Sequence, residues 1–192
     1  MKTLYIISAF IIGILLVNCG GADYARELGQ IDSLKKELNR TDSLITAINR
    51  ADIAKRADEI TNNSKFIQFN VNRMQDTLDY STALMLTQYK NIGDVYKKMD
   101  GEFNRLHSAI DSVNVGLENL RHDLLNHSLA KGVDPGASVL HESTEVFQIQ
   151  SYAGDLAKNL EDTRKSYDTL LPKVNSFVNR LNAQPGSFQP AP

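Results

Sequence analysis

The fold is decided by residues 85–124, which read MLTQYKNIGDVYKKMDGEFNRLHSAIDSVNVGLENLRHDL. Apolar residues recur along this stretch at alternating steps of four and three positions, without a slip. A seven-residue repeat with two apolar positions is typical of a helix that packs along a narrow seam, and it implies a left-handed coiled coil. The predicted coiled-coil seam consists of twelve residues: Met85, Tyr89, Ile92, Tyr96, Met99, Phe103, Leu106, Ile110, Val113, Leu117, Leu120 and Leu124.

The helix that carries this seam is predicted to extend over residues 64–130. Val71 and Leu78 continue its register towards the N-terminus, and the chain contains no proline before position 135. Asp100 and Gly101 could alternatively form a turn. The unbroken register across this dipeptide favours one continuous helix of about 100 Å, at about 1.5 Å per residue, whereas a break there would divide it into two helices.

A first helix is predicted upstream of the long one, over residues 23–60. An apolar stripe runs along it, although the phase of the stripe slips after Ile48. Asn62, Asn63 and Ser64 favour helix ends over helix interiors, because their side chains compete for backbone hydrogen bonds. We therefore expect a break or a kink near these residues, and the first helix can fold back along the first half of the long helix.

A third helix is predicted from a similar seam in residues 146–181. The loop before it, residues 131–138, contains Asp134 and Pro135, which fit a helix N-cap followed by proline at the first helical position. So short a connection makes the second and third helices antiparallel. Pro172 lies inside the third seam and is expected to kink the helix or divide it.

These patterns together predict an all-α protein. The expected architecture is an elongated antiparallel helical bundle or coiled coil of three long helices, or of four if the central helix breaks near Gly101. The helical domain is predicted to occupy residues 23–183. Residues 184–192 contain three of the five prolines in the chain and are predicted to form a disordered tail.

The N-terminal segment is typical of an exported protein. Lys2 precedes an uncharged apolar run over residues 4–17. As a helix this run would reach about 21 Å, which is short of the roughly 30 Å hydrocarbon core of a bilayer. The run ends in LVNC at residues 16–19, which resembles the lipobox of bacterial lipoproteins. In that family, diacylglycerol is attached to the cysteine sulfur, and the leader is cleaved immediately before the cysteine.

The resemblance covers residues 1–19 and implies how the chain is processed. Residues 1–18 would be a leader that is cleaved between Asn18 and Cys19, and the sulfur of Cys19 would carry the lipid. Residues 19–22 would then comprise the lipidated cysteine and a short Gly-Gly-Ala link to the helical domain. Asn18 departs from the commoner small residue before the cysteine. An uncleaved signal anchor with an incidental cysteine is the alternative.

The expected cellular location is the cell envelope. Gly20 stands where an aspartate would signal retention in the inner membrane of enteric bacteria. This predicts a lipid-anchored protein of the outer membrane, facing the periplasm or the cell surface. The net charge of −2, with both signs interspersed, gives no basic face of the kind that binds nucleic acid.

No catalytic constellation, cofactor or metal site is predicted. A helical metal-binding pair requires histidines three or four positions apart, whereas His122 and His127 are five apart. His127 is instead expected at the end of the central seam. Tyr89, Tyr96 and Phe103 follow one another along that seam, and they are expected to belong to the core rather than to a ligand platform.

The sequence therefore favours a non-enzymatic envelope lipoprotein. A long coiled-coil rod would contact other envelope proteins or a second copy of itself, and the lipid would hold it to the membrane. The alternative is a helical bundle of the periplasm that binds or senses a small ligand. The wide apolar stripe of the third helix and the aromatic residues on the central seam favour that alternative.

Overall fold

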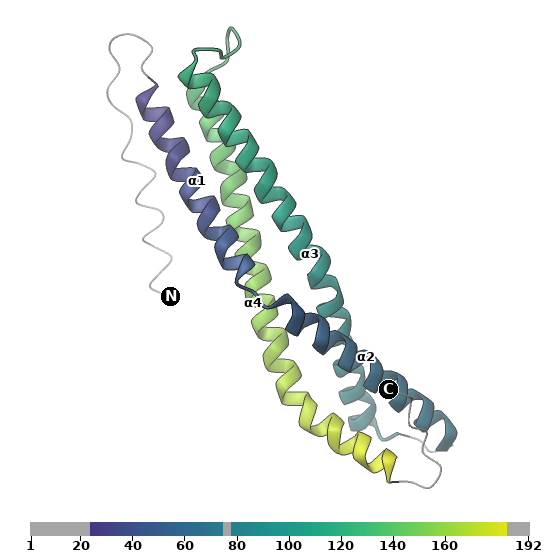
Figure 1. Cartoon of the computed structure of the whole chain (residues 1–192). Coiled ribbons are helices and arrows are strands. Elements are labelled where there is room, and N and C mark those ends of the chain that lie inside the picture. The colour runs from purple at the N-terminus through teal and green to yellow at the C-terminus, as the bar shows by residue number, and fades with distance from the viewer. Residues whose placement is uncertain (1–23, 75–77, 184–192) are drawn as a thin grey trace.

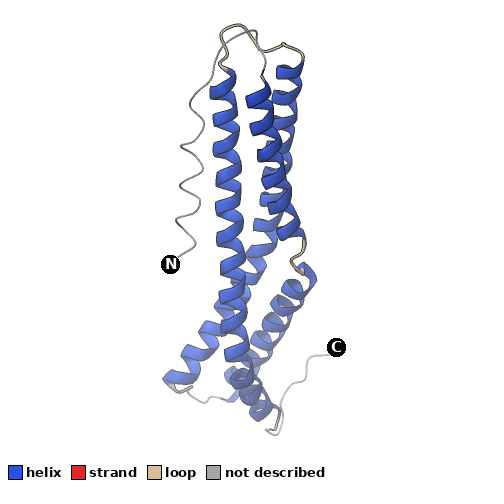
Figure 2. Cartoon of the chain, turned by 90° about the vertical axis from the view of Figure 1, so that its left-hand side faces the viewer, coloured by secondary structure: helices blue, strands red, loops and turns tan. Residues whose placement is uncertain are grey.

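The computed structural model describes residues 24–74 and 78–183. These residues are helical and contain no strand (Figure 2), so the prediction of an all-α protein is confirmed. The predicted leader, lipobox, link and C-terminal tail lie outside the described residues. The helices are α1 (Ala25–Thr46), α2 (Arg50–Met74), α3 (Tyr80–Leu125) and α4 (Pro135–Asn182).

The helices form an elongated rod (Figure 1). α3 and α4 run antiparallel along its length, and α1 followed by α2 lies beside them. Gln150 donates a hydrogen bond to Glu37 in α1, and Arg56 in α2 donates one to Asp168. These partners are 113 and 112 positions apart, so α1 and α2 both run parallel to α4 in nearly one register. Each level of the rod therefore contains three helices.

The structure has four helices where the sequence predicted three, or four with a break near Gly101. The chain breaks instead at residues 47–49, between α1 and α2. The predicted single helix over residues 23–60 is therefore wrong. The backbone N–H of Asp52 donates to the side chain of Asn49 at 3.0 Å and so caps the first turn of α2. The slip of the apolar phase at this point marks the break, because two separate helices can each turn their stripe towards α3 and α4.

The predicted break near residues 62–64 is also wrong, because these residues lie inside α2. The Thr61 hydroxyl donates to the carbonyl of Ala57 at 2.7 Å, and the Asn63 amide donates to the Tyr89 hydroxyl of α3 at 3.1 Å. The preceding turn of α2 and the packing against α3 thus each supply a polar partner where the sequence suggested a cap. Tertiary contacts of this kind routinely override a weak helix propensity.

The start of α3 at Tyr80 is later than predicted, since residues 64–74 belong to α2. The side chain of Asp79 caps α3, accepting from the N–H of Thr82 at 2.9 Å and from its hydroxyl at 2.7 Å. Hydrogen bonds from Ser81 and then Thr82 hold the pKa of Asp79 well below its usual range. α3 continues through Gly101, which excludes a turn there, and its 46 residues span about 69 Å rather than about 100 Å.

The cap predicted at the start of α4 is confirmed. The side chain of Asp134 accepts from the N–H of Gly136 at 2.9 Å, and Pro135 is the first helical residue. The connection from α3 covers residues 126–134, so it begins earlier than the predicted loop. Pro172 lies inside α4 without dividing it. Figure 1 shows the C-terminal part of α4 bent away from the line of its first half.

The core runs along α3. Ten of the twelve predicted seam residues are buried, and Met85 and Val113 are partly buried. Because α3 contacts α1, α2 and α4, one apolar face of this helix serves three neighbours. The buried apolar residues of α4 are Val139, Val146, Ile149, Ala153, Leu156, Leu160, Tyr167, Val174, Phe177 and Leu181.

Candidate functional site

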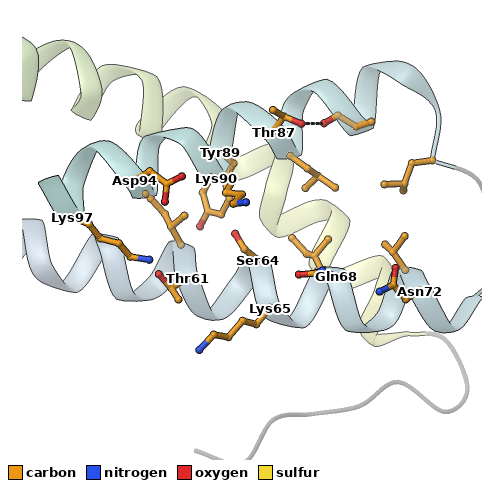
Figure 3. Close-up of a pocket in the computed structure, with 17 residues that line it drawn as sticks. Thr61, Ser64, Lys65, Gln68, Asn72, Thr87, Tyr89, Lys90, Asp94 and Lys97 are labelled. Atoms are coloured by element: carbon orange, nitrogen blue, oxygen red, sulfur yellow. Dashed lines mark hydrogen bonds between the residues drawn. The ribbon is translucent and has the colours of Figure 1, made fainter.

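A groove lies between α2 and α3 in the part of the chain that the structure describes (Figure 3). Its volume is about 530 Å³, which lies within the range of about 300–1,000 Å³ for small-molecule sites. The apolar side chains that line it are Ile60, Ile67, Val71, Leu78, Ala83 and Leu86. The groove therefore offers an apolar floor at the end of the rod where α2 ends and α3 begins.

Charged side chains line the same groove. Lys65 comes from α2, and Lys90, Asp94 and Lys97 come from α3. Figure 3 shows Lys97 beside Thr61. None of the three lysines forms an ion pair with a described residue. Three ammonium groups and one carboxylate thus leave an excess of positive charge at the groove.

The close approach of α2 and α3 at the base of the groove depends on Gly93. A Cβ atom at this position would lie 2.6 Å from Cγ2 of Ile60 and 3.2 Å from its Cβ. The second of these atoms is fixed to the α2 backbone, so any side chain at Gly93 would push the helices apart. Periodicity did not reveal this role, because Gly93 lies beside the seam and a heptad pattern carries no information about helix separation.

Tyr89, Tyr96 and Tyr167 form a cluster of aromatic rings next to the groove. The rings of Tyr89 and Tyr167 stack with centroids 6.2 Å apart, and Tyr96 meets Tyr167 edge to face at the same distance. The Tyr167 hydroxyl donates to the carboxylate of Glu59 at 2.9 Å. Tyr89 also lines the groove. The prediction that Tyr89 and Tyr96 belong to the core agrees with their burial, since each is 1% exposed.

Arg56 joins this tyrosine cluster to the surface of the rod. Its guanidinium lies 4.8 Å from the centroid of the Tyr167 ring, a distance suited to a cation–π contact. It also donates to Asp168 at 2.9 Å and to Asp52 at 3.1 Å. Burial disfavours the charge, but the hydrogen bond to Asp168 and the charge of Asp52 outweigh it and raise the pKa of Arg56. The guanidinium therefore acts as a permanent cation that holds α2 to α4.

One buried polar group in the cluster is left without a bond. The Tyr96 hydroxyl has no partner in hydrogen-bonding geometry among the described residues. Burial raises the pKa of Tyr96, while the charges of Arg56 and Arg164 oppose the rise. Burial and the bond to Glu59 also raise the pKa of Tyr167. Both phenols stay protonated at neutral pH, so neither supplies the anionic oxygen that a nucleophile or a general base requires.

The histidines are dispersed. Nδ1 of His107 lies 3.1 Å from a carboxylate oxygen of Asp42, and the ring of His127 lies 5.5 Å from that of Tyr24. His127 is exposed in the turn after α3 with a left-handed backbone, φ 53°, so its predicted place at the end of the seam is wrong. Within residues 24–74 and 78–183, no three histidine, cysteine, aspartate or glutamate side chains are grouped as a metal site requires.

Comparison with known proteins gives no relative. The chain matches no protein-family model, no curated protein and no solved structure. Among the described helices, none combines the length and the apolar character that crossing a membrane requires. The predicted lipidation site, Cys19, and the predicted cleavage site between Asn18 and Cys19 lie outside the described residues.

Proposed function

We propose that this protein is a lipid-anchored lipoprotein of the bacterial cell envelope, in which a coiled-coil rod acts as a non-enzymatic structural or protein-interaction module. The observation that carries the proposal is the polarity of the rod. Tyr24, at the start of α1, contacts His127 in the connection between α3 and α4. The end of α2 and the start of α3, whose side chains line the groove, lie towards the opposite end of the rod (Figure 1).

The distance between the Tyr24 end of the rod and the groove would hold the groove away from the membrane. Cys19 precedes Tyr24 by five positions, so lipid on its sulfur would hold the Tyr24 end of the rod near the bilayer. Gly93 and Leu125 are separated by about 48 Å along α3. Exposed apolar side chains lie at the groove end, with Tyr80 82% exposed, and also in the other half, where Leu140 is 68% exposed and Phe147 64%. The position of the groove end far from the lipid, and not the number of exposed apolar residues, therefore supports contact with a partner there.

Two experiments test this proposal. Labelled palmitate should be incorporated into the wild-type protein and not into Cys19→Ala. A photo-crosslinking amino acid placed at Tyr80, at the groove end, should capture a protein of the envelope or a second copy of the chain. The same amino acid at Lys131, in the connection between α3 and α4, is the control. Equal capture from both positions, or palmitate on Cys19→Ala, would contradict the proposal.

A helical bundle that binds or senses a small ligand is the second candidate function. The volume of the groove and its mainly apolar lining favour it. Co-purification of a small molecule with the protein, and its loss when the groove is filled by Ala83→Trp, would support ligand binding. Leu140→Trp, on the exposed face of α4, is the matched control.

A further inference from the structure

We propose that the α2–α3 groove binds a single-chain amphiphile with an anionic head group, such as a fatty acid. The head would lie among Lys65, Lys90 and Lys97, and the chain would run towards Leu78. The inference deepens the second candidate function, ligand binding, and it does not depend on lipid at Cys19.

The groove separates charge from apolar surface along α3. Leu78, just before α3, and Ala83 and Leu86, near its start, line one part of the groove, and Lys90 and Lys97 line the part that follows. From Ala83 to Lys97 the helix rises about 21 Å. The charges therefore gather towards one end of the groove, and the apolar side chains that α3 contributes gather towards the other.

α2 runs antiparallel to α3, and its lining alternates between apolar and polar side chains along the groove. Ile60 meets Gly93, and Asn63 meets Tyr89, so later residues of α2 lie beside earlier residues of α3. Lys65 accordingly lies level with the middle of the groove, where Figure 3 shows its flexible side chain directed away from α3, and Val71 lies level with the apolar end. Figure 3 shows Lys65 on the Thr61 side of Gln68 and Asn72, which line the other end together with the apolar residues.

The head group is argued from charge. The three lysines have no ion-pair partner among the described residues, and Asp94 is the acidic side chain among those that line the groove. An ammonium group is a compact charge that binds carboxylate or phosphate oxygens. Ser64 adds a hydroxyl group beside them. A carboxylate or phosphate head therefore meets both charge and hydrogen-bond donors.

A single-chain amphiphile fits this distribution better than a partner helix does. An amphipathic helix carries its charges along both flanks of its apolar stripe, so a groove built for it would place cations along its whole length. Here they gather towards one end. A molecule with one charged end and one apolar chain matches that pattern, and each methylene that it buries adds about 0.8 kcal/mol.

The test uses the full chain in isolated membranes and a photoactivatable fatty acid with a diazirine on its chain. After irradiation, mass spectrometry should locate the cross-link on residues 67–71 or 78–86. Excess dodecanoate should suppress the labelling, and dodecyltrimethylammonium should not. Parallel labelling of Cys19→Ala in a total cell lysate makes the result independent of whether Cys19 carries lipid.

Two sets of variants separate the groove from general membrane partitioning. Lys65→Gln, Lys90→Gln and Lys97→Gln combined should lower the labelling about tenfold, because the head loses its charge-assisted bonds. Lys55→Gln, Lys98→Gln and Lys158→Gln combined remove the same charge from exposed positions outside the groove and should leave labelling unchanged.

A third variant tests the apolar end without altering the lysines. Ala83→Trp should lower labelling by occupying the place of the chain, and thermal melting should confirm that each variant remains folded. Labelling that is absent from the groove in the wild type, that is equally suppressed by the cationic amphiphile, or that persists in the groove-lysine variant would overturn the proposal.

Discussion

The two halves of the rod use α3 and α4 in different ways. We call α1 with residues 104–125 and 135–158 the loop half, and α2 with residues 80–103 and 159–182 the groove half. In the loop half, cross-helix ion pairs join Lys35 to Glu118 and Asp32 to Arg121, outside an aliphatic core. In the groove half, Arg56 and the bond from Tyr167 to Glu59 join α2 to α4, Tyr89 and Tyr96 join α3 to α4, and a groove remains between α2 and α3.

The contrast teaches that a regular seam does not by itself produce a closed core. The seam of α3 is uninterrupted across both halves, yet a hollow of about 530 Å³ lies between α2 and α3 in the groove half, and one of about 430 Å³ lies between α3 and α4 in the loop half. Gly93 brings α2 against α3 at Ile60, whereas Leu78 and Leu86 further along line open space. The path of α2 relative to α3 decides where apolar surface stays available to a ligand in the groove half.

The largest expected effect compares the same truncation in both halves. Leu117 is fully buried in the loop half, so Leu117→Ala should lower the free energy of unfolding by about 3 kcal/mol. Leu86 is only partly buried and lines the groove, so Leu86→Ala should lower it by about 1 kcal/mol. Urea denaturation of the two variants measures both values. Equal losses would mean that the groove is closed in solution.

The second prediction concerns the close approach of α2 and α3. Gly93→Ala should destabilise the protein by about 2 kcal/mol, because the new methyl group overlaps Ile60 and the helices must separate. Gly101→Ala is the matched control in the same helix, since a Cβ there meets nothing within 4 Å. It should raise the free energy of unfolding by about 1 kcal/mol through helix propensity. A stabilising Gly93→Ala would show that the two helices lie further apart.

The third prediction separates the hydroxyl groups of the tyrosine cluster. Tyr167→Phe should lower the free energy of unfolding by about 1 kcal/mol, because it removes the hydrogen bond to Glu59. Tyr96→Phe should leave stability unchanged or raise it slightly, because the buried Tyr96 hydroxyl has no partner to lose. Thermal melting of the pair at neutral pH checks the difference. The reverse order would place the unbonded hydroxyl on Tyr167.

The smallest expected effect lies in the loop half and depends on pH. Burial raises the pKa of Glu142 above its ordinary value of 4.5, with the charge of His141 opposing and that of Glu145 assisting. A carboxyl whose pKa rises on folding destabilises the fold when ionised, and the penalty disappears as pH falls through the raised pKa. Glu142→Gln should therefore melt at a slightly higher temperature than the wild type at pH 7.

Measurement of the same pair in acid completes the test. Below the ordinary pKa both the folded and the unfolded wild type carry a protonated Glu142, so the advantage of Glu142→Gln should vanish. An advantage that persists in acid would mean that shape rather than charge distinguishes the two side chains.

The sequence by itself determined that the protein is helical, where α3 places its apolar face, and how α4 begins. These features depend on local spacing and capping, as in the seam around Phe103 and the cap at Asp134. The phase slip after Ile48 also marked the break between α1 and α2, although the three Asn and Ser residues at 62–64 suggested another place. The N-terminal lipobox remains a prediction from sequence.

Only the tertiary structure decided how far the helices extend and where the groove lies. Asn63 stays helical because Tyr89, 26 positions away, supplies its partner. Arg56 meets Tyr167 from a helix 111 positions distant, and the need for glycine at position 93 appears only when Ile60 lies against it. Periodicity records which face of a helix is apolar, whereas separation and partnership between helices depend on residues that local spacing does not connect.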